Sequence, residues 1–417
     1  MSLSRLFARI SAIYREYPRP FWTLAVITFI DHIGGFLLFP FFALYLTSKF
    51  QVGMSEVGVL FATFSIAGFF GSTIGGALTD RFGRKGVIVF GLLASAFSAV
   101  AMGFAQSFEA FFALAVFVGV LSDVGGPARQ AMVADLLPEE QRADGYGIIR
   151  VAFNLSAAIG PAIGGFVASR SYLALFLSDA VIAVLSVFLI WFLLPESKPE
   201  PHPDAKPESI GGTIAGYGQV FSNRLFMLFL GAVFLSVLAY LNMNTTLGVY
   251  MRDAHGLAEN YYGMLLAMNA VMVVVLQFPV TRRVSKYPPM LMMALHSLLY
   301  VIGFGMYGFV GTYALMAVAM VIITIGEMVG APVQQALVAS FAPPDMRGRF
   351  MAVAGYSWGI AYAVGPYLAG RLLDGPRPDM LWYAAAIAAL LSVVGFVALQ
   401  RAHAGAQTVE AVPETAS

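Results

Sequence analysis

The chain has 417 residues, of which 59% are hydrophobic and 11% are charged, whereas a soluble domain carries roughly 25% charged residues. The formal net charge of +1 gives no reason to expect a nucleic-acid partner, and the lack of cysteine excludes disulfides and thiolate metal sites. This composition excludes a soluble globule and predicts an all-α integral membrane protein.

Residues 1–20 form a basic segment in which Leu6, Ile10 and Ile13 would share one face of a helix. The alternative is a signal peptide, but the apolar run after Pro20 is too long and no small-residue cleavage site is evident. We therefore expect an uncleaved amphipathic helix on the cytoplasmic membrane surface.

About twenty apolar residues are needed to cross a bilayer as a helix. By this criterion the chain contains twelve predicted spans, near 21–47, 54–78, 86–105, 110–134, 145–169, 172–194, 225–250, 261–280, 288–309, 313–341, 350–373 and 380–400. A stretch rich in proline and charge follows the sixth span and predicts a flexible cytoplasmic linker. The expected domains are a six-helix bundle over 21–194, the linker over 195–224, a second six-helix bundle over 225–400 and a disordered cytoplasmic tail over 401–417.

The distribution of Lys and Arg predicts that both termini are cytoplasmic, because cytoplasmic loops carry an excess of these residues. In this orientation seventeen Lys and Arg residues fall on the inner side and five on the outer side. The five are Lys49, Arg170, Arg252, Arg371 and Arg377. We expect a multi-pass protein of the inner or plasma membrane.

The two halves repeat each other at a constant offset. Segment 125–142 matches 330–347 at eight of eighteen positions, and the same offset relates a Gly-Pro pair in each half and Tyr45 to Tyr250. One register shared by three regions predicts two bundles related by a pseudo-two-fold axis along the membrane normal, with the substrate path between them.

The loop after the second span reads GGALTDRFGRKG and resembles the G-x-x-x-D-R-x-G-R-K signature of the major facilitator superfamily, in the position where that family has it. We expect the first glycine to allow close helix approach, the second to make the turn, and the acid to accept hydrogen bonds or cap a helix. The matched residues are Gly76, Asp80, Arg81, Gly83, Arg84 and Lys85.

The resemblance implies a twelve-helix fold and a cytoplasmic latch at this loop. Asp135 and Arg142, at the cytoplasmic end of the fourth span, are candidates to join the latch. Two alternatives stay open: the basic residues of the loop only set topology, and Asp135 and Arg142 form a charge pair at a helix end.

The fifth span carries SAAIGPAIGG, which resembles the family's antiporter motif G-x-x-x-G-P-x-x-G-G. The matched residues are Gly160, Pro161, Gly164 and Gly165, while Ser156 replaces the first glycine. Small residues allow close backbone approach and proline bends a helix. The resemblance implies a proton-coupled exporter; ordinary small-residue packing is the alternative, and a related VGPYLAG in the second half weakens the motif's diagnostic force.

The fourth span departs from many drug exporters of the family, which carry an arginine midway along it. This stretch has Asp123 and no basic residue before Arg129. The tenth span, with GEMVGAPVQQ around Glu327, is similar to a subset of multidrug exporters in which the glutamate handles protons or cations.

Asp31, Asp123 and Glu327 are acids inside predicted spans. A charge at the bilayer centre costs roughly 2.5–3.5 kcal/mol, so such residues usually serve function. The resemblance places all three on helices that line a central cavity. There they are candidates for proton coupling and for binding a cationic substrate, whereas the alternative is a static partner such as Arg129 or Arg150 for Asp123. Arg150 is a candidate to neutralise a cavity acid or to bind an anionic group.

Three other titratable residues in spans have weaker claims. Asp179 lies about seven residues into the sixth span, near enough to the surface to reach water. His32 is a candidate proton relay or a packed side chain, and His296 is expected to be packed.

The substrate cavity is expected to be apolar and adaptable, because Met and aromatic side chains can repack around varied ligands. Packing in the protein or against lipid is the alternative for each of them. The candidate lining residues are Phe36, Tyr240, Asn242, Asn244, Met328 and Trp358.

These observations predict a secondary active transporter, with proton-coupled efflux of lipophilic or cationic small molecules by alternating access. The alternative is a carrier for a defined solute, such as a sugar, peptide or lipid-like molecule, working by proton symport. Enzymatic motifs, a Walker motif and metal-binding motifs are missing from the sequence. We expect no enzyme activity and no cofactor, and we expect the proton gradient to be the energy source. The expected partners are a small-molecule substrate, protons and the lipid bilayer, without nucleic acid. The protein is expected to be a monomer.

Overall fold

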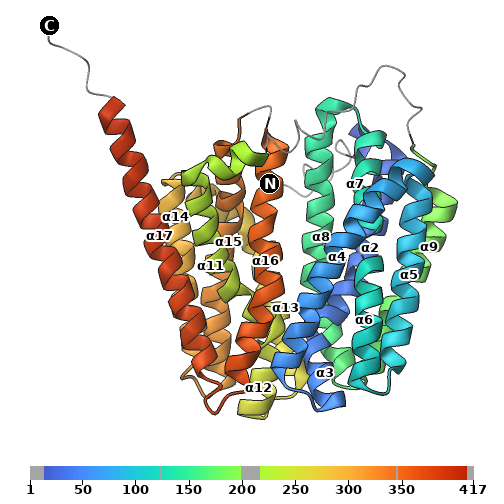
Figure 1. Ribbon diagram of the computed structural model, residues 1–417, viewed down its shortest axis with the longest axis horizontal. Helices are drawn as coiled ribbons and strands as arrows, with labels where there is room; N and C mark the ends of the chain where they lie inside the picture. The colour runs from blue at the N-terminus through green and yellow to red at the C-terminus, as the bar shows by residue number, and fades with distance from the viewer. Residues whose placement is uncertain (1–13, 123, 199–216, 344–345, 411–417) are drawn as a thin grey trace, which may run out of the picture. The chain divides into compact units, whose positions relative to one another are not determined.

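The computed structural model describes residues 14–122, 124–198, 217–343 and 346–410, and every regular element in these ranges is helical. The predicted all-α class is therefore confirmed. The elements are α2 (Arg19–Leu38), η1 (Phe39–Phe41), α3 (Phe42–Phe50), α4 (Met54–Phe82), α5 (Arg84–Phe104), α6 (Phe108–Ser122), α7 (Gly125–Leu136), α8 (Glu139–Ala168), α9 (Tyr172–Leu193), α11 (Arg224–Thr245), α12 (Leu247–His255), α13 (Glu259–Val284), α14 (Pro289–Tyr307), α15 (Tyr313–Phe341), α16 (Arg347–Leu373) and α17 (Met380–Glu410) (Figure 1).

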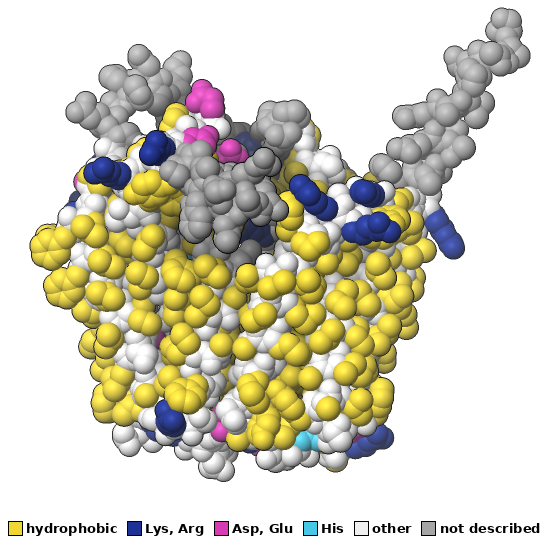
Figure 2. All heavy atoms as spheres, turned by 180° about the vertical axis from the view of Figure 1, so that it is seen from behind, with side chains coloured by type: hydrophobic (Ala, Val, Ile, Leu, Met, Phe, Trp, Pro, Cys, Tyr) yellow, Lys and Arg dark blue, Asp and Glu magenta, His cyan; other side chains and the backbone are white. Residues whose placement is uncertain are grey.

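Within the described residues, eleven helical segments are long and apolar enough to cross a membrane. Figure 2 shows hydrophobic side chains over the middle of one face and Lys and Arg side chains near its upper and lower edges. The twelfth predicted span, 350–373, is helical as α16 but does not reach the same hydropathy, because glycine, serine, tyrosine and arginine interrupt its apolar residues. The exact count of twelve spans is thus not confirmed.

The repeat register found in the sequence extends to the helix boundaries. The first five helices of the second half, α11 to α15, begin at the repeat equivalents of the first residues of α2, α3, α4, α5 and α6 respectively. The short helices α3 and α12 even end alike, at the left-handed residues Gln51 (φ 53°) and Gly256 (φ 63°), which are also equivalent positions. The two halves are therefore built on one plan.

A pair of equivalent hydrogen bonds supports the same register. The Tyr45 hydroxyl donates to the carbonyl of Met102 at 3.3 Å, and the Tyr250 hydroxyl donates to the carbonyl of Tyr307 at 3.1 Å. The two donors are equivalent positions in the repeat, and so are the two acceptors. The repeat predicted from sequence is thus also a repeat of contacts.

The chain forms two compact units, and each takes a helix start from the other half. Unit 1 comprises 1–52, 59–203 and 258–270, and unit 2 comprises 53–58, 204–257 and 271–417. In unit 1, α2 packs on α8 and α9, and α5 packs on α9 and α7. In unit 2, α14 packs on both α15 and α17, and α11 packs on α16 and α17 (Figure 1).

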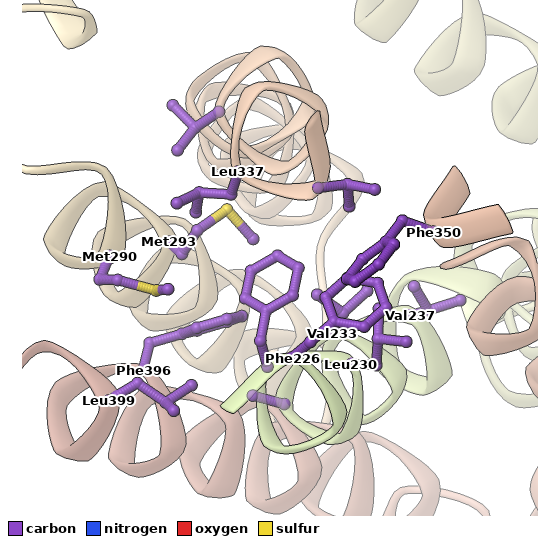
Figure 3. Close-up of a cluster of buried hydrophobic side chains, with 14 of the residues drawn as sticks. Phe226, Leu230, Val233, Val237, Met290, Met293, Leu337, Phe350, Phe396 and Leu399 are labelled. Atoms are coloured by element: carbon purple, nitrogen blue, oxygen red, sulfur yellow. The ribbon is translucent and has the colours of Figure 1, made fainter. Parts of the chain in front are cut away.

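Unit 2 contains an extended cluster of buried apolar side chains. Figure 3 shows Phe226 and Leu230 of α11 among side chains from α14, α15, α16 and α17, including Met293, Phe350 and Phe396. The contacts between distant helices thereby fix the faces that α11 and α15 turn inward, which positions the residues of the candidate site.

The C-terminal tail and the first and fourth predicted spans have other boundaries in the structure than in the prediction. The tail expected to be disordered from residue 401 is helical through Glu410, because RAHAGAQTVE is rich in helix-forming residues and its first proline comes later. The first predicted span breaks at η1, where Pro40 removes a backbone donor, and the fourth divides into α6 and α7. Residues 1–13, 199–216 and 411–417, within the predicted N-terminal helix, linker and tail, lie outside the described residues.

Two glycines of α14 provide a test of the packing. A Cβ on Gly303 would lie 2.5 Å from Ile323 Cγ1 and 3.0 Å from the Ala319 carbonyl, whereas one on Gly305 would meet only Ala386 Cβ at 3.5 Å. Gly→Ala in a helix favours folding by about 1 kcal/mol where space allows. We expect Gly303→Ala to lower the apparent melting temperature in detergent and Gly305→Ala to leave it equal or higher. Equal melting temperatures for the two variants would contradict the α14–α15 crossing.

Candidate coupling and gating sites

Asp31 of α2 forms an ion pair with Arg129 of α7 in unit 1. The Nη1 to Oδ2 distance is 2.5 Å, and the side chains of Arg129 and Asp31 are 25% and 16% exposed. Charge-assisted bonds of this kind are about twice as strong as neutral ones. The sequence analysis left Arg129 as one possible static partner of Asp123, and among the described residues Arg129 pairs with Asp31. Asp123 itself lies outside the described residues.

The surroundings of this pair are partly polar. His32 Nδ1 donates to the Thr28 carbonyl at 2.8 Å, and the His32 ring packs edge-on against Phe153. Phe36, a predicted cavity residue, contacts the same Phe153 ring at 5.0 Å between centroids. Arg150 of α8 is exposed and forms no ion pair with any described residue. The structure thus brings Asp31 and Phe36 into one neighbourhood and does not pair Arg150 with an acid.

Glu327 of α15 accepts a hydrogen bond from the Tyr240 hydroxyl of α11 at 3.1 Å in unit 2. The Tyr240 ring stacks on Tyr300 with centroids 6.0 Å apart and meets Trp358 edge-on at 5.8 Å. Trp358 in turn lies 6.4 Å from the ring of Tyr362. Two predicted cavity residues, Tyr240 and Trp358, therefore belong to the aromatic surroundings of Glu327.

Other predicted cavity residues are placed differently. The side chain of Asn242 is satisfied within its own helix, since its amide donates to the Leu238 carbonyl at 2.9 Å and its oxygen accepts from Thr246. Met328 is fully buried, so it has no surface to offer a ligand in this structure. Asn244 is partly exposed and its side chain makes no hydrogen bond to a described residue. The polar contact to Glu327 that comes from α11 is therefore made by Tyr240, and neither asparagine makes one.

Two side chains that sequence reasoning missed hold the backbone around Glu327. Pro332 lacks an N–H and so frees the Met328 carbonyl, four residues earlier, which accepts from Gln277 Nε2 at 3.0 Å. On the other flank, His296 Nδ1 donates to the Gly326 carbonyl at 2.8 Å. The proline inside α15 predicts that the Met328 carbonyl lacks its helical partner, but nothing in the sequence identifies Gln277 as the donor that replaces it.

His296 is buried, as expected, with both ring nitrogens engaged. A carbonyl only accepts, so the proton lies on Nδ1, and Nε2 accepts from the Ser236 hydroxyl at 2.9 Å. The ring also fills the space beside Gly330, where a Cβ would clash with it. The histidine therefore joins α11, α14 and α15 immediately before Glu327 in the chain.

The predicted latch loop is organised around an ion pair and an unexpected glutamate. Arg84 Nε lies 2.7 Å from Asp135 Oδ2, and the two side chains are 12% and 13% exposed. Glu196, just after α9, accepts from the backbone N–H groups of Arg84 at 2.8 Å and Lys85 at 3.2 Å. It thus caps the start of α5, where carboxylates are favoured. Gly83 makes the turn with φ 92°, as predicted.

The remaining latch residues have local partners. Lys85 Nζ donates to the Trp191 carbonyl, and the Arg81 carbonyl accepts from Lys198 Nζ at 2.9 Å. Arg142 Nε donates to the carbonyls of Ala134 and Leu137, so it binds the end of α7 and makes no ion pair with Asp135. The side chain of Asp80 lies outside the described set.

Gly76 makes no close helix approach to the described residues. A Cβ on Gly76 would meet none of them within 4 Å, whereas one on Gly71 or Gly75 would clash with the backbone of α6 or of Val124. The close approach within unit 1 lies on the face that Gly71 and Gly75 share at i and i+4, whereas Gly76 points about 100° away around the helix.

The antiporter motif provides close packing in unit 1. A Cβ on Gly160 would lie 2.6 Å from Phe36 Cβ, one on Gly164 would clash with the Leu37 carbonyl, and one on Gly165 would lie 2.8 Å from Gly263 Cα. Pro161 lies inside α8, and Ser156 donates to the Phe29 carbonyl at 2.8 Å. The predicted close approach is confirmed for all three glycines.

An equivalent contact occurs in unit 2. Gly370 is the repeat equivalent of Gly165, and a Cβ there would clash with the backbone of Met54. Asp374, one turn later, accepts from the N–H groups of Met54 and Ser55, both at 2.7 Å, and so caps α4. Sequence reasoning did not single out Asp374.

The sequence profile of the Major Facilitator Superfamily matches residues 24–366 and 229–415. The chain belongs to this superfamily.

The Na(+), Li(+), K(+)/H(+) antiporter of Planococcus maritimus is 25% identical over 379 residues, which cover 84% of this chain and 89% of that protein. Multidrug resistance protein 1 of Bacillus subtilis is 26% identical over 259 residues, which cover 62% and 65%. A solved structure of the nucleoside transporter NupG, 13% identical, shares the fold with a TM-score of 0.74 over 92% of this chain and 99% of that one.

Membership of the Major Facilitator Superfamily makes the protein a multi-pass membrane transporter. The eleven apolar helical segments and the repeat of contacts agree with this assignment. The superfamily fold does not identify the substrate, so the substrate class has to be inferred from the chemistry of the site.

The Glu196 cap generates a test. Glu196→Ala removes the acceptor for two N–H groups at the start of α5, and a lost cap costs about 1 kcal/mol. We expect a lower apparent melting temperature than for Glu109→Ala, which alters an exposed acid in the first turn of α6. Matching melting temperatures for the two variants would show that Glu196 does not hold the loop.

Proposed function

We propose that the protein is a proton-coupled exporter of lipophilic or cationic small molecules, with Glu327 as a residue at which proton and substrate compete. The observation that carries the proposal is the hydrogen bond from Tyr240 to Glu327 within an apolar helix. A phenol is a neutral donor, so it stabilises the carboxylate without supplying the full charge that would fix its protonation state.

The side chains around Glu327 suit a lipophilic cation. Tyr240, Tyr300, Trp358 and Tyr362 form a connected series of rings, and aromatic faces attract cations at about 0.5–2 kcal/mol per contact. When Glu327 is ionised, its charge favours a cation; when it is protonated, that attraction is lost. Competition for one carboxylate therefore couples proton entry to substrate release.

Relatives support exchange with protons. The protein of Planococcus maritimus is named as an antiporter of Na(+), Li(+) and K(+) with H(+), and that of Bacillus subtilis as a multidrug resistance protein. The packing of Gly160, Gly164 and Gly165 is also what an antiporter motif requires. We propose further that the Arg84–Asp135 pair and Glu196 hold the cytoplasmic latch, that both termini are cytoplasmic, and that the proton gradient is the energy source for a monomer.

Two other substrate classes follow from specific features. Exchange of alkali cations for protons is the second candidate, because the relative with that name aligns over most of the chain. Symport of a defined solute, such as a sugar, peptide or lipid-like molecule, is the third, since the fold is shared with a nucleoside transporter. The direction of proton movement separates symport from both exchange reactions.

Proteoliposomes with an imposed proton gradient test the role of Glu327, with ethidium as the lipophilic cation and Na(+) and K(+) as alternative substrates. We expect ethidium transport to be coupled to opposite proton movement, and Glu327→Gln to abolish the coupling. Tyr240→Phe removes one hydrogen bond of about 1 kcal/mol and should weaken transport about 5-fold without abolishing it.

The control is Asp253→Asn, which changes an exposed acid of α12 paired with its neighbour Arg252. Full proton-driven ethidium transport by Glu327→Gln would refute the assignment of this residue. Movement of protons in the same direction as the substrate would replace export by symport.

A further inference from the structure

Asp179 of α9 lies against α2 in the middle of unit 1. Its Oδ1 would be only 2.6 Å from a Cβ on Gly34, so glycine at that position makes room for the carboxylate. Gly34 follows Asp31 by three residues, close to one helical turn, and the two carboxylates lie near enough to interact electrostatically.

The sequence placed Asp179 near enough to the membrane surface to reach water, and in the structure the residue is partly buried in unit 1. The residue lies seven positions after Tyr172, roughly 10 Å along α9 at 1.5 Å per residue. Its side chain packs on Gly34, and a bulkier residue there would have pushed it away. Asp179 is therefore partly buried and held against α2.

Few charged groups face Asp179. The helices packed against α9 are α2, α5 and α8. The stretch of α5 from Gly86 to Phe104 has no titratable residue, and neither has α8 after Arg150, which is itself exposed. On α2 the titratable neighbours are Asp31 and His32, and the His32 ring is engaged with Thr28 and Phe153. Among the described residues Asp179 has no ion pair and no hydrogen bond.

Asp31 and Asp179 interact electrostatically, and only Asp31 is paired with an arginine among the described residues. Arg129 binds Asp31 directly, while its Nε is buried and has no hydrogen-bond partner within the described part of the chain. If both carboxylates were ionised, the group would carry an uncompensated negative charge in an apolar setting, which is costly. One bound proton removes that charge, and the carboxylate without an ion pair is the one that gains most from binding it.

We propose that Asp179 is the proton-carrying residue of unit 1, while Asp31 stays ionised through its contact with Arg129. The inference rests on the proposed proton coupling and adds a second protonation site to Glu327. In the cycle, Asp179 takes a proton from water on one side of the membrane and returns it to water on the other. When the proton leaves, the charge on Asp179 repels that on Asp31, so deprotonation weakens the contact of α9 with α2 at Gly34.

Infrared spectroscopy of the purified protein in lipid nanodiscs tests the protonation directly. A protonated carboxyl has its own C=O stretching band, and we expect Asp179→Asn to remove one such band from the neutral-pH spectrum. Asp31→Asn should weaken the band, because the negative charge that favours a proton on Asp179 is gone. The control Asp253→Asn should leave it unchanged. A full band in Asp179→Asn would overturn the proposal.

Transport separates this inference from the proposed function. In Asp179→Asn proteoliposomes we expect proton-driven ethidium transport to fall at least 10-fold while ethidium counterflow without a gradient persists, and Asp179→Glu to restore part of the driven transport. Undiminished driven transport in Asp179→Asn, together with its loss in Glu327→Gln, would refute the role of Asp179 and leave the proposed function standing. If the wild type moves no protons, the infrared result alone decides whether Asp179 holds one.

Discussion

The cost of a carboxylate in an apolar helix is the constraint on which the polar interior depends. For Asp31 the cost is offset by an ion pair with an arginine at 2.5 Å, and for Glu327 by a hydrogen bond from a tyrosine hydroxyl at 3.1 Å. For Asp179, the proton that we propose would remove the charge itself. These solutions differ in how firmly they fix the charge. An arginine holds a carboxylate ionised, a phenol tolerates either state, and a bound proton can leave.

The two units share a scaffold but not its chemistry. Asp31 corresponds through the repeat register to Ser236, which bonds His296, and Arg129 corresponds to Gln334. Glu327 corresponds to Ser122, and Asp179 to Ala384. Helix starts, helix breaks and tyrosine-to-carbonyl bonds repeat, whereas these four charged residues do not. The two halves therefore have equivalent helices but carry acidic residues at different positions on them.

Sequence reasoning was most reliable where the signal is local. Apolar length predicted the spans, Gly83 predicted a turn, and the small residues of α8 predicted close packing. Each of these depends on neighbours along the chain or on a property of one residue, so no knowledge of helix rotation is needed.

The pairings could not be predicted, because they depend on which faces of distant helices meet. Arg129 has Asp31 and Asp123 within possible reach by sequence, and only the crossing of α2 and α7 selects Asp31. For the same reason Tyr240 was not recognised as the partner of Glu327, Glu196 was overlooked as a cap, and Gly76 was preferred to Gly75. Met328 was assigned to a cavity although it is fully buried.

The central claim is that a proton and a cationic substrate compete for a carboxylate within the helices. Proton release on ligand binding measures this competition without transport: the purified protein is held in weakly buffered detergent solution with a pH indicator, and ethidium is added. The account predicts that the wild type releases protons as it binds ethidium and that Glu327→Gln releases fewer. Saturable binding of ethidium by the wild type with no proton release would contradict it.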